Sequence, residues 1–173
     1  IWERILEIEA FSYNIVAARV IKTPLDTKNS YDEKINQYWN TKKIAVPNVQ
    51  PGSVIEYRYL VQSQYLFNLR DWTFQWKIPV VYSEYEVHMI PFYEYKFILQ
   101  GVSSFDEQES YIETGMPHRF GSVEYQNYIH RYAMKEVPAF KDESFISSIN
   151  DYIIKMDFQL SKVIQPTGSI RNI

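Results

Sequence analysis

The chain contains three histidines, His88, His118 and His130, which are its first candidates for acid–base or metal chemistry. A Ser-His-Asp hydrolase typically places its serine on a strained elbow in the pattern Gly-x-Ser-x-Gly, and this pattern is absent from the sequence. No two histidines have the H-x-x-x-H spacing, which argues against a zinc site. His88 alternates with Glu84 and Glu86, so we interpret it as part of a solvated strand face.

Carboxylates are the next candidates, because Glu84, Glu86 and Glu94 could form a patch for a hard cation. Calcium loops gather their oxygen ligands within one short segment with a fixed glycine, and neither this run nor "FDEQES" has that pattern. Glycoside hydrolysis needs two carboxylates whose separation is set in three dimensions, and the sequence singles out no pair. We therefore expect exposed strand carboxylates.

Composition excludes further classes of function. The chain of 173 residues has no cysteine, which excludes a thiol nucleophile, a disulfide framework and a thiolate zinc site. A net charge of −3 argues against a nucleic-acid binder, which needs a basic stripe. No apolar run approaches the roughly 20 residues of a membrane helix, and no glycine-rich phosphate loop is present. We predict no catalytic residue, cofactor or metal in this chain.

Aromatic residues make up 17% of the chain and are its most unusual feature. Trp and Tyr are common anchors at binding surfaces, and they can stack on sugar rings or on a protein partner. They also pair across strands in the cores of β-proteins, which we favour for Trp72 and Trp76. The tyrosines are too numerous for all of them to be buried, so an exposed aromatic surface would indicate an interface.

Alternation of apolar and polar residues predicts strands throughout the chain. In "PNVQPGSVIEYRYLVQ", residues 47–62, Pro51-Gly52 predicts a turn, and the strand after it should bury one face. The residues of that face are Ile55, Tyr57, Tyr59 and Val61. On the opposite face, Glu56 is interpreted as an outward residue or a structural hydrogen-bond acceptor.

The same period of two recurs at residues 72–78, 83–89, 92–99 and 151–160, and 123–134 is apolar on both faces, as expected for an inner strand. Pro79 should bend the chain. The spacing of these strand segments and the prolines between them predict an all-β fold. We expect a two-sheet antiparallel β-sandwich with at most short helices. Residues 30–39 fit a short helix as well as a loop, and 142–151 can hold one helical turn. We expect a single domain over 1–165 and a tail or linker over 166–173.

Three sequence blocks together resemble a known family: "KIAVPNVQPGSVIEYRY", "FNLRDWTFQWKIPVVYSEYEV" and "EVPAFKDESFISSINDYIIKMDFQL". They are similar to the bacterial domain of unknown function found immediately N-terminal to transglutaminase-like domains of the papain-like class. The shared features are the Pro-Gly-Ser-Val-Ile-Glu-Tyr turn and strand, Asp71-Trp72 with the following Ile-Pro, and the segment 138–143. The resemblance covers about residues 5–163.

The resemblance implies a β-rich extracytoplasmic module, periplasmic or on the cell surface, beside a catalytic domain that begins after Ile173. It also implies opening strands upstream of Ile1, so that the sheet is incomplete here. The Cys-His-Asp machinery of such catalytic domains does not carry over, since the chain has no cysteine. The expected partner is the transglutaminase-like domain of the same polypeptide.

The leading functional hypothesis is a non-catalytic accessory domain that packs on that partner or recruits its substrate. The alternatives are a module that binds glycan, peptidoglycan or peptide through exposed Trp and Tyr, and a stand-alone hydrolase, for which no catalytic set is present. The candidate interface consists of aromatic residues and of the segment that leads towards the expected partner: Trp72, Trp76, Tyr82, Tyr85, Pro138, Phe140, Lys141 and Asp142.

Overall fold

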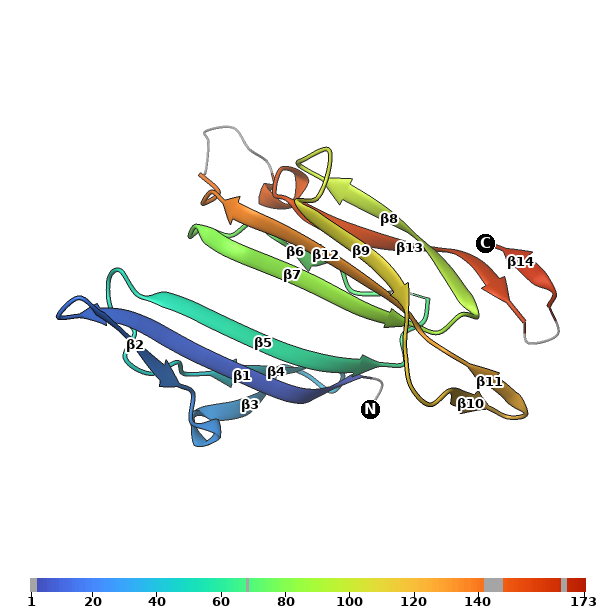
Figure 1. Cartoon of the computed structure of the whole chain (residues 1–173), viewed down its shortest axis with the longest axis horizontal. Helices are drawn as coiled ribbons and strands as arrows, with labels where there is room; N and C mark the ends of the chain where they lie inside the picture. Colours follow the sequence, from blue (N-terminus) through green and yellow to red (C-terminus); the bar gives the residue numbers. More distant parts are fainter. Residues whose placement is uncertain (1–2, 68, 142–147, 166–167) are drawn as a thin grey trace. The chain divides into compact units, whose positions relative to one another are not determined.

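The computed structural model describes residues 3–67, 69–141, 148–165 and 168–173, and its chain forms two compact units, residues 1–64 and 65–173. Both units are built from antiparallel strands, which confirms the all-β prediction (Figure 1). Helical structure in the described residues is limited to two 3-10 turns. The expectation of one domain over 1–165 stays a prediction.

The first unit holds a three-stranded sheet in the order β2-β1-β5 and a two-stranded sheet formed by β3 and β4. Each strand pair in both sheets is antiparallel. Its elements are β1 (Glu3–Val16), β2 (Arg19–Pro24), η1 (Thr27–Asn29), β3 (Ser30–Lys34), β4 (Asn40–Ile44) and β5 (Val54–Ser63).

The turn before β5 is fixed to β1 by buried polar side chains. Ser12 Oγ donates to the carbonyl of Pro47 at 2.6 Å, and Asn14 Nδ2 donates to the carbonyl of Asn48 at 2.9 Å. The predicted turn at Pro51-Gly52 is confirmed, with Gly52 at φ +90°, a conformation that glycine adopts without a Cβ penalty.

The face of β5 is less buried than predicted. Ile55, Tyr57 and Tyr59 lie on one face, but 42%, 48% and 41% of their surfaces are exposed, so their predicted burial is wrong. Segment 47–53 bonds instead to Ser12 and Asn14 of β1, and both of these side chains are buried. Glu56 accepts a hydrogen bond from the Tyr13 hydroxyl, which confirms its interpretation as a structural acceptor.

The short helix considered for residues 30–39 is absent, because this segment contributes to the β3–β4 hairpin. Lys42 pairs with Asp32 across the hairpin, with Nζ 2.8 Å from a carboxylate oxygen. In the turn, the side-chain oxygen of Asn36 accepts hydrogen bonds from the backbone N–H groups of Tyr38 and Trp39. These contacts satisfy the backbone in a turn and outcompete the local helical spacing.

The second unit contains two larger sheets and a small hairpin. One sheet has the order β7-β12-β9; in the other, β13 pairs with β8, β14 and the short β6, and β10 with β11 forms the hairpin. The elements are β6 (Trp72–Thr73), β7 (Val80–Met89), β8 (Tyr93–Gln100), β9 (Glu107–Ile112), β10 (His118–Phe120), β11 (Val123–Tyr125), β12 (Tyr128–Val137), η2 (Ile149–Asp151), β13 (Lys155–Ile164) and β14 (Ile170–Asn172).

The core of the second unit lies between its two larger sheets, in the manner of a β-sandwich. Tyr132 and Met134 from β12 pack with Met156 from β13 in one buried cluster, together with Phe74. A second cluster joins β7 to β8 and β13. The inner strand predicted over residues 123–134 is confirmed for β12, which is paired on both sides, whereas residues 123–125 form β11 of the hairpin. Pro79 lies between a bend and the start of β7, as expected.

One predicted strand is much shorter than its alternation suggested. Residues 72–78 were expected to place four apolar side chains on one face, but β6 ends at Thr73, Phe74 is fully buried, and Trp76 is half exposed. The cause is a distant partner: the N–H groups of Phe74 and Gln75 both donate to the carbonyl of Ile154, at 2.9 and 3.3 Å. A shared acceptor interrupts the ladder, so the alternation stops.

Candidate interaction surface

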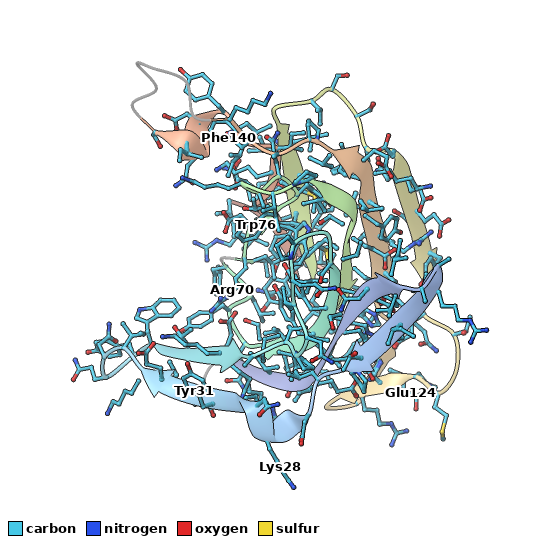
Figure 2. The ribbon with its side chains drawn as sticks, turned by 90° about the vertical axis from the view of Figure 1, so that its left-hand side faces the viewer. Lys28, Tyr31, Arg70, Trp76, Glu124 and Phe140 are labelled. Carbon is cyan, nitrogen blue, oxygen red and sulfur yellow. The ribbon has the colours of Figure 1, made fainter. Side chains whose placement is uncertain are left out.

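Two segments of the candidate interface meet in the second unit. The backbone N–H of Phe140 donates to the carbonyl of Trp76 at 2.8 Å, and Gln75 Nε2 donates to the carbonyl of Pro138 at 3.1 Å. Figure 2 shows Trp76 and Phe140 on neighbouring parts of this unit. The segment after β12 is thereby held against the segment after β6.

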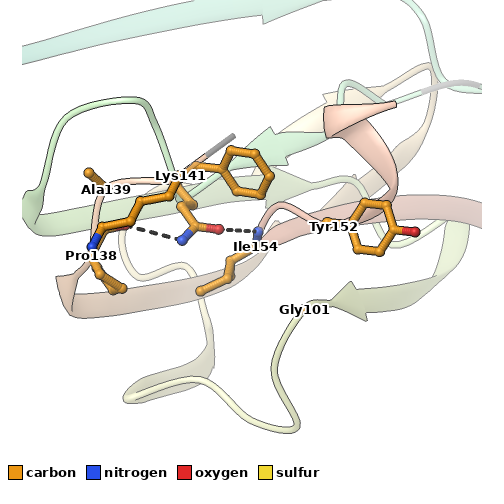
Figure 3. A pocket seen from close by; sticks show the side chains of 8 residues that line it. Gly101, Pro138, Ala139, Lys141, Tyr152 and Ile154 are labelled. Carbon is orange, nitrogen blue, oxygen red and sulfur yellow. Dashed lines mark hydrogen bonds between the residues drawn. The ribbon is translucent and has the colours of Figure 1, made fainter. Parts of the chain in front are cut away.

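Gln75 connects this pair of segments to β13. Its Oε1 accepts a hydrogen bond of 3.3 Å from the N–H of Ile154, and its Nε2 donates to the carbonyl of Pro138. Both polar atoms of the amide therefore have partners. Figure 3 shows the two bonds as dashed lines, with Tyr152 at the far end from Pro138. Because the amide is committed at both ends, it acts as a structural clamp.

A shallow hollow of about 410 Å³ lies along this clamp. Lys141 supplies the positive charge among its lining residues, and Gly101 forms part of its wall close to the backbone of Ile154. The hollow offers aromatic area and one cation, which suit contact with apolar and acidic groups of a partner. Its lining includes Gln75, Gly101, Phe140, Lys141, Tyr152 and Ile154.

Exposed apolar side chains flank the two meeting segments. Trp76 has 52% of its surface exposed, and Ile78 and Tyr152 are also exposed. Large exposed apolar side chains that lie close in sequence and are fixed by backbone bonds are typical of contact surfaces. We call Trp76, Ile78, Pro138, Phe140 and Lys141 the Trp76–Phe140 surface.

Trp72 and Tyr85 pack against the core cluster instead. Their rings lie 5.4 Å apart between centroids, and the indole N–H of Trp72 donates to Ser83 Oγ at 3.1 Å. This position confirms the core interpretation for Trp72 and leaves these two side chains little area for a partner. The same core interpretation is wrong for Trp76, because 52% of its surface is exposed.

Tyr82 lies apart from the Trp76–Phe140 surface, on the charged face of the β7-β12-β9 sheet. Its hydroxyl donates to Glu84 at 2.5 Å, and this bond, with a smaller effect of burial, raises the pKa of Tyr82 to about 12. Arg131 Nη1 lies 2.9 Å from the same carboxylate oxygen, Glu84 Oε2. The phenol therefore stays protonated at neutral pH and serves as a hydrogen-bond donor.

The histidines take structural positions. His118 Nε2 lies 2.7 Å from Glu113, and this hydrogen bond is the main cause that lowers the pKa of Glu113. His88 contacts Glu86 on the exposed face, as interpreted. His130 is held by Ser110 at 2.8 Å, and burial lowers its pKa. Among the described residues, no group of three or more acidic or histidine side chains is placed to hold a metal.

Sequence reasoning missed the clamp and part of the surface. Gln75, Ile78 and Tyr152 were not among the candidates, although the exposed aromatic types were a signal for the last of them. Asp142 lies outside the described residues. Whether any of these residues contacts a partner stays a prediction.

The chain was compared with protein-family models, with curated proteins and with solved structures, and no match was found. Within the part of the chain that the structure describes, none of the helical segments has the length and apolar character needed to cross a membrane.

Proposed function

We propose that this chain is a non-catalytic accessory module that uses the Trp76–Phe140 surface to pack against a transglutaminase-like domain of the same polypeptide. The observation that carries this proposal is the bond between Phe140 and Trp76, which fixes exposed apolar side chains next to the segment leading towards the expected partner. The resemblance of the three sequence blocks supplies the partner class and an extracytoplasmic location.

The proposed mechanism is contact area. A tryptophan in a buried contact contributes a large, rigid surface, and such residues carry much of the binding energy at protein interfaces. Lys141 adds a positive charge at the rim of the hollow, where it would orient an acidic group of the partner or of a recruited peptide. No bond is made or broken by this chain.

Calorimetry of the full-length polypeptide tests the contact. Trp76→Asp places a charge in the contact, so we expect it to lower the unfolding temperature of the adjoining domain. Met116→Asp is the matched control, because Met116 is 91% exposed in the same unit and lies outside the surface. Equal unfolding temperatures for the adjoining domain in both variants and in the wild type would refute the contact.

A second candidate function is binding of glycan or peptidoglycan, favoured by the half-exposed indole of Trp76, whose neighbour Gln75 lines the hollow. Sugar rings stack on exposed indoles, and Trp76→Ala should then abolish retention on a peptidoglycan affinity gel. Trp72→Phe, in the core, should keep it. The absence of retention for the wild-type chain would remove this candidate.

A further inference from the structure

The hairpin between β1 and β2 has an unusual turn. Its two loop residues, Ala17 and Ala18, both have positive φ values, 49° and 61°. Two-residue hairpin loops of this kind favour Asn-Gly, because those residues tolerate the left-handed conformation. Alanine brings a Cβ into this conformation and is disfavoured there. The chain thus keeps two methyl groups at the tip although the backbone conformation favours other residues.

The strand ends next to this turn are apolar on both faces of the ribbon. Ile15 pairs with Val20 on one face, and these side chains are 77% and 67% exposed. Val16 and Ile21 belong to the other face and are also exposed. Together with the two alanines, they place apolar side chains on both faces of the hairpin end, where Arg19 lies opposite Val16.

The opposite face of the tip continues into a second hollow, of about 310 Å³. Val16, Ile21 and Val49 form its apolar part, and Asn14 and Asn48 are among its polar lining. The apolar area of the tip therefore extends a short way down the ribbon. It ends at the side-chain amides of Asn14 and Asn48, which are polar.

The charge of the tip is positive. Residues 15–22 include Arg19 and Lys22 and no acidic residue, although the whole chain has a net charge of −3. Lys22 sits at the base of the tip, with its ammonium 3.6 Å from the centre of the Phe11 ring. Arg19 and Lys22 lie beside an apolar end. This combination complements a surface whose interior is apolar and whose outer layer is anionic.

We propose that the β1–β2 hairpin tip, residues 15–21, inserts into the interfacial region of an anionic lipid surface. A protein pocket normally covers one face of a ribbon, whereas acyl chains surround an inserted tip on all sides, as the apolar side chains on both faces require. Arg19 and Lys22 meet the anionic headgroups. This inference is independent of the Trp76–Phe140 surface, which belongs to the other unit.

Co-sedimentation with vesicles tests the proposal. The chain is expected to bind vesicles of equal parts phosphatidylglycerol and phosphatidylcholine, and the double variant Ile15→Asp, Val20→Asp should lower the partition coefficient at least about tenfold. The matched control is Met116→Asp, Ile170→Asp, which makes the same charge change at exposed apolar side chains of the second unit and should bind like the wild type.

Two further variants separate the contribution of the positive charge from that of apolar insertion. Arg19→Gln should weaken binding to the vesicles with phosphatidylglycerol and leave binding to pure phosphatidylcholine unchanged. Ile15→Trp keeps the tip apolar, and its added indole should give a blue-shifted emission on adding anionic vesicles; the wild-type chain, with the same four other tryptophans, is the reference.

Three outcomes would overturn the proposal. The wild-type chain could remain in the supernatant with both kinds of vesicle. The tip double variant and the control double variant could lose binding equally, which would show that the loss comes from the change in net charge alone. The tip could instead mediate self-association, seen as a concentration-dependent sedimentation coefficient that Ile15→Asp, Val20→Asp abolishes, without vesicle binding. Circular dichroism spectra matching the wild type establish that each variant is folded.

Discussion

Phe140 donates its backbone N–H to the carbonyl oxygen of Trp76 at 2.8 Å, so two segments far apart in the sequence share one edge of the second unit. The bond holds the backbone on both sides while the Trp76 side chain remains half exposed. Because the backbone is already fixed, less conformational entropy is lost when a partner binds, which favours a docking surface.

The two tryptophans should respond differently to truncation. Trp72→Ala removes a ring that packs on Tyr85 and the core cluster, so we expect a loss of about 3 kcal/mol in the free energy of unfolding. Trp76→Ala should change that free energy by less than about 0.5 kcal/mol, because exposed side chains contribute little. Urea unfolding of the chain measures both, and equal losses would contradict the assigned positions.

Gly101 should be sensitive to substitution for two reasons. Its φ is +85°, and an added Cβ would lie 3.1 Å from Ile154 Cα, a backbone atom with little freedom to move. Gly168 is the matched control, since its φ is +86° and nothing lies within 4 Å of an added Cβ. Gly101→Ala should therefore destabilise the second unit by about 1–2 kcal/mol more than Gly168→Ala. Thermal unfolding is the measurement, and equal losses would show that the backbone conformation alone sets the effect.

Glu113 should make stability depend on pH. Its pKa is lowered mainly by the hydrogen bond from His118, so its contribution to folding is present above the unfolded pKa of about 4.5 and is lost as the pH falls through the lower folded value. Glu113→Gln should lower the unfolding temperature slightly at pH 7, by less than about 3 °C, and the difference from wild type should vanish in acid.

Hydrogen exchange in the β10–β11 hairpin gives a local readout of the same bond. Its amides should exchange faster in Glu113→Gln at pH 7, while Glu136→Gln, which makes the same charge change elsewhere, should leave them unchanged. A difference in unfolding temperature that persists undiminished in strong acid would contradict the account.

Relief of strain at the β1–β2 turn should raise stability. Ala17→Asn with Ala18→Gly installs the residues that two positive φ values favour, and we expect a gain of about 1–2 kcal/mol in the free energy of unfolding of the first unit. Ala45→Gly is the control, since Ala45 does not have a positive φ and should give no gain. The same double variant should bind anionic vesicles more weakly, because the tip loses both methyl groups.

Much of the fold follows from local patterns in the sequence. Alternation identified β5, β7, β8 and β13, and an apolar pattern on both faces identified the inner strand β12. Pro51-Gly52 placed the turn before β5. These features depend on neighbouring residues alone, which is why a single sequence contains them.

Features that depend on distant partners were not predictable. The early end of β6 follows from the carbonyl of Ile154, and the hairpin at residues 30–44 depends on the pairing of residues 30–34 with 40–44. The exposure of Tyr57 and Tyr59 depends on what packs against their face of β5, which the alternation of the strand does not specify. The clamp made by Gln75 joins three parts of the chain and has no sequence signal of its own.

Hydrogen exchange of this chain alone and of the full-length polypeptide tests the central claim, that the Trp76–Phe140 surface contacts the adjoining domain. The account predicts slower exchange in the full-length polypeptide for the amides of residues 76–78 and 139–141, with unchanged rates in the central strand β12. Identical exchange of those segments in both samples would contradict it.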